Sequence, residues 1–186
     1  MARALRSLAL ALLCGPVQAQ GITINDGPML ALLGAGEGPN GYDEVYRGAT
    51  LRPPKPVSKM TIAEVLHYQD RMVAAGSISS AIGRYQFIRG TLRELVKQNR
   101  IDIRAPFNAR TQDYLARIML ANCGFYHPEG EMTEIGNCLS QVWAALPVMT
   151  GRNAGRSYYH GRAGNRALTT VARVSRTLEA RFSPRD

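Results

Sequence analysis

Side chains that bind metals are few in this sequence of 186 residues. Its three histidines, His67, His127 and His160, are scattered and show none of the spacings typical of metal ligands. Internal repeats and low-complexity tracts are missing, and alternating strand patterns are scarce. These absences exclude repeat architectures and sheet-rich folds, and they predict no metal site.

Long apolar runs are missing after residue 20, so no later segment predicts a membrane span. The first 20 residues instead combine a basic start (MARALR), an apolar run (SLALALLCG) and a small-residue cleavage site (VQA), as secretory signals do. Cys14 raises the alternative of a lipoprotein, but Leu13 before it is not the small residue such a signal has. We predict a signal peptide over 1–19, cleaved after Ala19, and a periplasmic or secreted protein without stable membrane insertion.

Cysteine is rare, and removing Cys14 with the signal leaves only Cys123 and Cys138. In an oxidising compartment a lone pair most simply forms one disulfide. Closing a loop of that size stabilises a fold by about 3 kcal/mol in the chain-entropy view. Two buried free thiols are the alternative.

Lysine is also rare, so arginine supplies nearly all of the positive charge. The formal charge of +9 falls to +7 when Arg3 and Arg6 leave with the signal. A basic exported protein suits an anionic partner such as cell-wall polymer, lipid headgroups or nucleic acid. Nucleic acid is a poor default outside the cytoplasm, so we do not expect it as a partner.

The patterning that is present is mainly helical, in a chain suited to one globular domain. Asp26 before Gly27-Pro28 is typical of a helix N-cap, and Thr61 with Glu64 fits a capping box. Predicted helices span 28–37, 61–75, a segment from about 84 through 91–94, 108–123, 135–146 and 168–178. A small β ribbon is expected near 42–51, which makes the fold class mainly α (α+β).

Glu37 in LLGAGEG has the surroundings of an acid catalyst. Apolar neighbours disfavour its ionised form, and the negative end of the preceding helix raises its pKa further. The flanking glycines leave room for a polymer to approach the carboxyl. The alternative is a solvated glutamate at the end of a helix.

Three blocks, LLGAGEGPNGYDEVYRG, SSAIGRYQFIRGT and NCLSQVWAALP, give the chain a resemblance to a known family. In their order and spacing they resemble the lambda-phage-type endolysins, which are peptidoglycan lytic transglycosylases with a lysozyme-like α fold. The resemblance runs from about Leu30 to Leu146, although the segment Arg52–Gln69 has no close counterpart. It implies a lysozyme-like catalytic domain over 20–186.

The resemblance also implies roles for individual residues. It makes Glu37 the catalytic acid, Tyr42 and Asp43 supports of the site, and Gly83, Arg84, Tyr85, Gln86 and Trp143 parts of the substrate-binding cleft. Each has a structural alternative. Tyr85 and Trp143 suit a core, with a core role favoured for Trp143; Arg84 suits a solvated or ion-paired position, Gln86 a helix cap, and Asp43 a loop support.

A single carboxylate suffices if the sugar supplies its own nucleophile. Glu37 would protonate the oxygen between N-acetylmuramic acid and N-acetylglucosamine, then take the proton of the muramic C6 hydroxyl as the 1,6-anhydro ring closes. No cofactor is needed. The alternatives are a hydrolytic muramidase, which normally uses two carboxylates, and a non-catalytic wall-binding or assembly protein of the same fold. We expect a monomer that acts on peptidoglycan glycan strands, with an envelope-spanning assembly as one possible context.

Overall fold

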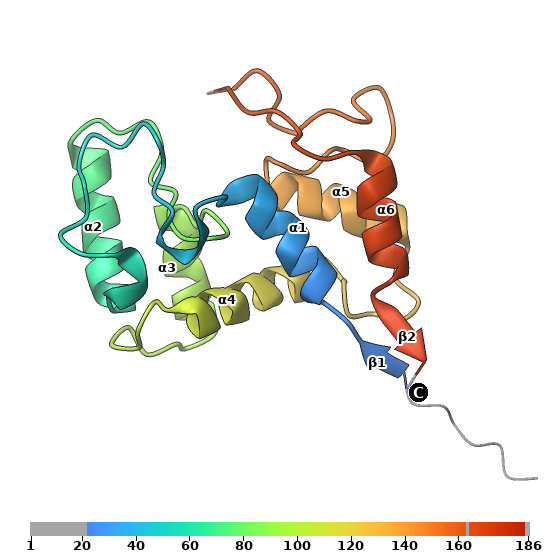
Figure 1. Ribbon diagram of the computed structural model, residues 1–186, viewed down its shortest axis with the longest axis horizontal. Helices are drawn as coiled ribbons and strands as arrows, with labels where there is room; N and C mark the ends of the chain where they lie inside the picture. Colours follow the sequence, from blue (N-terminus) through green and yellow to red (C-terminus); the bar gives the residue numbers. More distant parts are fainter. Residues whose placement is uncertain (1–21, 163, 185–186) are drawn as a thin grey trace, which may run out of the picture.

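The computed structural model describes residues 22–162 and 164–184, and within them six α-helices dominate (Figure 1). In chain order these elements are β1 (Ile22–Ile24), α1 (Gly27–Glu37), the 3-10 turns η1 (Gly41–Asp43) and η2 (Val57–Lys59), α2 (Ile62–Ala74), α3 (Arg89–Gln98), α4 (Ala109–Asn122), α5 (Met132–Val142), α6 (Val171–Glu179) and β2 (Phe182–Pro184). The prediction of a mainly α fold is confirmed. The predicted signal over 1–19, with Cys14, lies outside the described residues.

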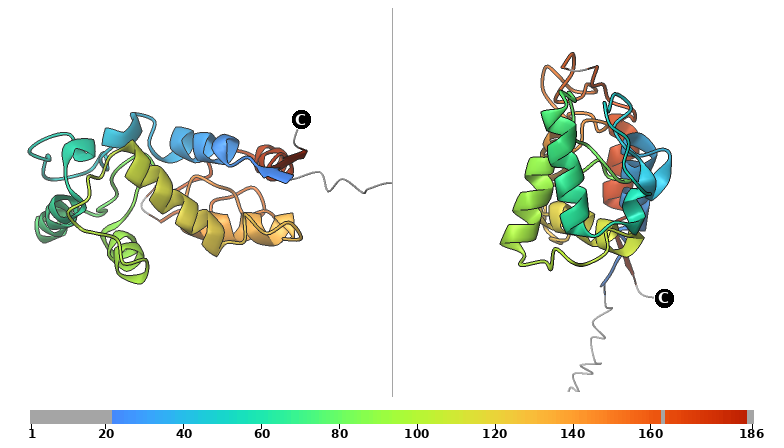
Figure 2. Two further views of the ribbon diagram at one scale, coloured as in Figure 1. Left: turned by 90° about the horizontal axis from the view of Figure 1, so that it is seen from below. Right: turned by 90° about the vertical axis from the view of Figure 1, so that its left-hand side faces the viewer.

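The helices form two groups that are bridged by α4 (Figures 1 and 2). Helices α2 and α3 pack on each other in one group, while α6 packs on both α5 and α1 in the other. One continuous core joins the groups, and Phe87 and Phe107 meet edge to face within it at 5.9 Å between ring centroids. No helix in the described part of the chain is long and apolar enough to cross a membrane.

Local signals set several helix starts as predicted. The Oγ1 atom of Thr61 accepts from the backbone N–H of Glu64, and the Glu64 carboxylate accepts from the backbone N–H of Thr61, so the capping box is confirmed. Asn108 caps α4 through Thr111. Asp26 does precede α1, but its carboxylate makes no capping bond.

The Asp26 carboxylate instead joins distant parts of the chain. It accepts from Arg117 at 2.7 Å and from the hydroxyl of Tyr126 at 2.9 Å. These bonds lower its pKa although burial acts in the opposite direction. The N-terminus of α1 is therefore held against α4 and the segment that follows it.

Three predicted elements differ from the structure. The ribbon expected at 42–51 is wrong: that segment makes one isolated bridge, Val45 with Ile82, and the described two-stranded sheet pairs β1 with β2 near the chain ends. The third helix begins at Arg89 rather than near Arg84, because residues 82–87 form a tight turn. Helix α5 ends at Val142, before the expected boundary at 146.

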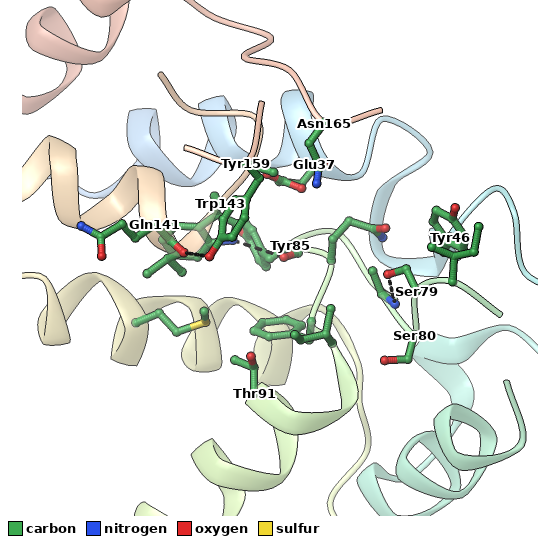
Figure 3. A pocket seen from close by; sticks show the side chains of 18 residues that line it. Glu37, Tyr46, Ser79, Ser80, Tyr85, Thr91, Gln141, Trp143, Tyr159 and Asn165 are labelled. Atoms are coloured by element: carbon green, nitrogen blue, oxygen red, sulfur yellow. Dashed lines mark hydrogen bonds between the residues drawn. The ribbon is translucent and has the colours of Figure 1, made fainter. Parts of the chain in front are cut away.

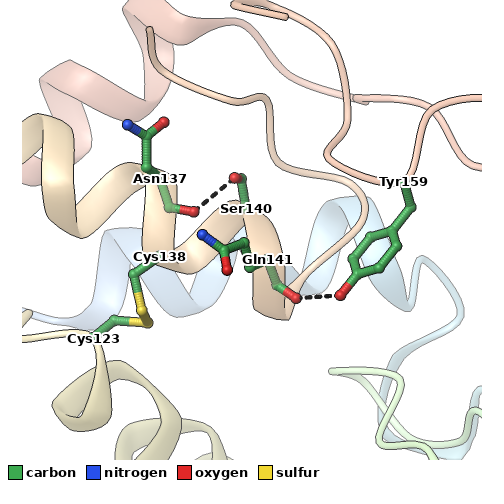
Figure 4. Close-up of a disulfide and its surroundings, with 6 residues drawn as sticks. All are labelled: Cys123, Asn137, Cys138, Ser140, Gln141 and Tyr159. Carbon is green, nitrogen blue, oxygen red and sulfur yellow. Dashed lines mark hydrogen bonds between the residues drawn. A yellow bond between two sulfur atoms is a disulfide. The ribbon is translucent and has the colours of Figure 1, made fainter. Parts of the chain in front are cut away.

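A disulfide links Cys123 at the end of α4 to Cys138 in α5 (Figure 4), which confirms the predicted pair. The two Cα atoms are 5.5 Å apart, and the residues are 15 positions apart in the sequence. The bond closes the connection between α4 and α5. It therefore anchors the second half of α5, whose C-terminal end reaches the candidate site.

Candidate active site

A cleft of about 670 Å³ lies between the two groups of helices (Figure 3). Four of the residues predicted for the site line it, and they are Glu37, Tyr85, Gln86 and Trp143. Tyr46, Gln141, Tyr159 and Asn165 also line it, and sequence reasoning did not find them. The cleft is thus built from segments of the chain that are far apart in sequence.

Glu37 is the last residue of α1, and its half-buried side chain enters the cleft. Helix α1 ends here because Gly38 leaves the helical conformation and Pro39 follows. The Oε1 atom of Glu37 accepts a hydrogen bond of 2.8 Å from the backbone N–H of Ala145. Burial raises the pKa of Glu37, and the bond from Ala145 partly offsets this. Among the described residues that line the cleft, Glu37 is the single carboxylate.

The glycines around Glu37 allow close packing of α1 on two neighbours. A Cβ atom on Gly34 would collide with the guanidinium group of Arg84, and one on Gly38 would lie 2.5 Å from the carbonyl oxygen of Arg84. A Cβ atom on Gly36 would lie 2.8 Å from that of Ala145. The glycines of GAGEG therefore let Arg84 and Ala145 approach the helix on both sides of Glu37.

Gly83 and Arg84 have structural positions rather than cleft positions. Gly83 has a positive φ of 76°, and a Cβ atom there would collide with Oε1 of Gln112, so the missing side chain makes room for Gln112. The guanidinium group of Arg84 lies against Gly34 and 5.4 Å from the ring centre of Tyr42. Neither residue lines the cleft.

Tyr85, Gln86 and Trp143 form part of the cleft wall. Tyr85 and Trp143 are each 2% exposed, and the indole N–H of Trp143 donates to the carbonyl oxygen of Tyr85 at 3.2 Å. Gln86 has a left-handed φ of 49°, and its amide group donates to the carbonyl oxygen of Gly83 at 2.9 Å. The two aromatic residues are thus buried supports that border the cleft, while Gln86 closes its own tight turn.

Asp113 organises this wall, although no sequence signal pointed to it. Its Oδ1 atom accepts from the hydroxyls of both Tyr85, at 2.7 Å, and Tyr42, at 2.9 Å. Burial and these bonds raise the pKa of both tyrosines. Asp43 has a similar local task, because it accepts from the backbone N–H of Ser58 at 2.8 Å and fixes the loop. Tyr42 and Asp43 do not line the cleft.

Two buried glutamines hold the loop that contains Tyr85. Gln69 donates to the carbonyl oxygens of Ser80 and Phe87, both at 2.8 Å. Gln112 accepts from the backbone N–H of Arg84 and donates to the carbonyl oxygen of Tyr42, each at 2.9 Å. Both side chains are fully buried, so side-chain amides here take the place of strand partners.

The segment between α5 and α6 covers one side of the cleft. The hydroxyl of Tyr159 donates to the carbonyl oxygen of Gln141 at 2.6 Å (Figures 3 and 4). Asn165, half-buried, lies beside Glu37 among the residues that line the cleft. Within residues 22–162 and 164–184, no group of three or more His, Cys, Asp and Glu side chains is arranged to hold a metal ion.

Comparisons with protein families, with curated proteins and with solved structures find no match to this chain.

Proposed function

We propose that this protein is an exported peptidoglycan lytic transglycosylase with a lysozyme-like catalytic domain. The observation that carries the proposal is the position of Glu37, a half-buried carboxyl with a raised pKa at the end of α1. Among the described residues it is the one acid that lines a cleft large enough for several sugar rings. The disulfide and the predicted signal peptide support an exported location.

Two opposing influences suit Glu37 to act first as an acid and then as a base. Burial favours the protonated carboxyl, which donates its proton to the glycosidic oxygen as the bond to the muramic C1 breaks. The N–H group of Ala145 then stabilises the carboxylate that remains. This carboxylate takes the proton of the muramic C6 hydroxyl while the C6 oxygen bonds to C1, so Glu37 ends protonated and no water is consumed.

The lining of the cleft suits amino sugars. Tyr46 and Tyr159 offer partly exposed aromatic surface for pyranose rings. Gln86, Gln141 and Asn165 supply amide donors and acceptors for acetamido and hydroxyl groups. A hydrolase of the common two-carboxylate kind would need a second acid facing Glu37. That the described lining of the cleft holds a single carboxylate therefore favours ring closure over hydrolysis.

The test is mass spectrometry of the fragments released from purified peptidoglycan sacculi. We expect products with 1,6-anhydromuramic ends, one water lighter than the reducing ends that a muramidase makes. Glu37→Gln should abolish release, whereas Glu179→Gln, at the exposed end of α6, removes the same charge and should leave release unchanged. Reducing ends would overturn the transglycosylase assignment, and activity in the Glu37→Gln variant would overturn the assigned acid.

A further inference from the structure

The cleft continues beyond the reaction centre into a second groove of about 310 Å³. Thr91, Met119 and Val142 line both the cleft and this groove, so the two spaces meet at these side chains. The part beyond them is lined by Glu94, Leu95, Gln98 and Asn122. We call this second space the α3–α4 groove.

Helical spacing gives the α3–α4 groove its shape. Thr91, Glu94, Leu95 and Gln98 stand at positions i, i+3, i+4 and i+7 of α3 and so form one stripe along its surface. Seven residues of helix rise about 10 Å, which is the length of about three residues of extended peptide. On α4, Met119 and a residue three positions later, Asn122, border the same groove.

The lining of the α3–α4 groove differs in chemistry from that of the cleft. Five aromatic side chains border the cleft (Tyr46, Tyr85, Phe87, Trp143 and Tyr159), whereas no aromatic residue lines the groove among the described residues. Its surface combines apolar side chains (Leu95, Met119, Val142) with two amides (Gln98, Asn122). Amide side chains can donate to and accept from a peptide backbone. The groove therefore fits a short peptide better than further sugar rings.

Glu94 adds a charge preference. Its Oε1 atom accepts from the amide of Gln98 at 2.9 Å, and it forms no ion pair within the described part of the chain. The exposed carboxylate is thus available to a cationic group of a ligand in the groove. The peptide stems on muramic acid carry such a group, because the diamino acid at the third position has a side-chain ammonium, which in diaminopimelate stands beside a carboxylate.

We infer that the α3–α4 groove binds the peptide stem of peptidoglycan, with Glu94 pairing with the side-chain ammonium of the diamino acid. The inference rests on the proposed function for its substrate class. The groove's continuity with the cleft lets a muramic acid near Glu37 extend its stem along α3. The enzyme would then select glycan strands that carry stems with a free amine.

The test is a titration of the nitrogen-15-labelled protein with a disaccharide tetrapeptide, GlcNAc–MurNAc–L-Ala–γ-D-Glu–diaminopimelate–D-Ala, followed by NMR. We expect the side-chain amide signals of Gln98 and Asn122 to shift. Acetylating the amine of the diaminopimelate should weaken binding about two- to five-fold, the range of an exposed ion pair. Glu94→Gln should remove that difference, while Glu179→Gln should keep it.

Other outcomes overturn the inference. Equal dissociation constants for the free and acetylated peptides, unmoved signals of Gln98 and Asn122, or a difference that persists in Glu94→Gln would each exclude it. Equal shifts with a peptide-free GlcNAc oligomer would assign the groove to glycan. Cleavage of peptide-free glycan strands tests the proposed function separately. Cleavage without groove shifts defeats only the inference. Groove shifts with an affinity difference that depends on Glu94, but without cleavage, defeat only the proposed function.

Discussion

An alanine at Gly36 tests how closely the end of α1 must approach Ala145. The new Cβ atom would lie 2.8 Å from the Cβ atom of Ala145, whereas carbon atoms pack best at about 3.5–4.0 Å. The two segments would have to separate by roughly 0.7 Å or more. Overpacking of this kind costs about 1–3 kcal/mol, and the better helix propensity of alanine returns up to about 1 kcal/mol.

The steric contribution can be isolated with a double-mutant cycle. Ala145→Gly removes the opposing methyl group, so in the double variant the new methyl of residue 36 occupies the vacated space. We expect a coupling free energy of about 1–3 kcal/mol between the two substitutions, measured by urea unfolding with unchanged slopes. Gly90→Ala is the control, because a Cβ atom there meets nothing within 4 Å. Additivity within about 0.5 kcal/mol would refute the reasoning.

The same substitution tests the electrostatics of Glu37. Moving Ala145 away weakens the N–H bond to the Glu37 carboxylate, and that bond lowers the pKa. In Gly36→Ala we therefore expect the pKa of Glu37 to rise further and the alkaline limb of the activity profile to move to higher pH. A carbon-13 NMR titration of the carboxyl would measure the pKa directly, and an unchanged or lower value would contradict this account.

Three more predictions concern stability. Burial raises the pKa of Glu37 in the folded state, so the stability that its protonated carboxyl contributes is complete below the pKa of the unfolded state and is lost as pH rises through the folded-state pKa. Glu37→Gln should therefore unfold at a higher urea concentration than the wild type at pH 8, and the difference between their midpoints should close near pH 4. Equal midpoints at pH 8 would count against this. Replacing both Cys123 and Cys138 by serine should lower the free energy of unfolding, measured by urea titration, by about 3 kcal/mol. Reduction of the disulfide in the wild type should give the same loss. Thr61→Ala should cost about 1 kcal/mol by the same measurement, against little change for Thr50→Ala at an exposed site, and equal effects would argue against the capping box.

Features that depend on neighbours in sequence could be predicted. The capping box at Thr61, the cap at Asn108 and the start of α1 directly after Asp26 each need only three or four consecutive residues. The disulfide could be predicted because only two cysteines follow the predicted signal peptide. The position of Glu37 at the end of α1 follows from Gly38 and Pro39 in the same way.

Features that depend on side chains distant in the sequence could not be predicted. The segment 42–51 was expected to pair as a ribbon, yet the carbonyl oxygen of Tyr42 accepts from the buried amide of Gln112, 70 positions away. Gly83 and Arg84 directly precede the cleft-lining Tyr85 in the sequence, but Gly83 lies against Gln112 and the side chain of Arg84 lies against Gly34. A local pattern gives the position of a turn and not the direction in which it faces.

Side chains, rather than pairing within a sheet, hold Tyr85 and Gln86 at the wall of the candidate site. Gln112 binds the backbone of the turn and Asp113 binds the hydroxyl of Tyr85, so two adjacent residues of α4 hold one wall of the cleft. Helix α4 is also tied to α1 through Arg117 and Asp26, and α1 ends at Glu37. The acid and the wall it faces are therefore positioned by the same helix. Because α4 is in turn joined to α5 by the disulfide, we expect loss of that bond to loosen the geometry around Glu37 as well as to lower stability.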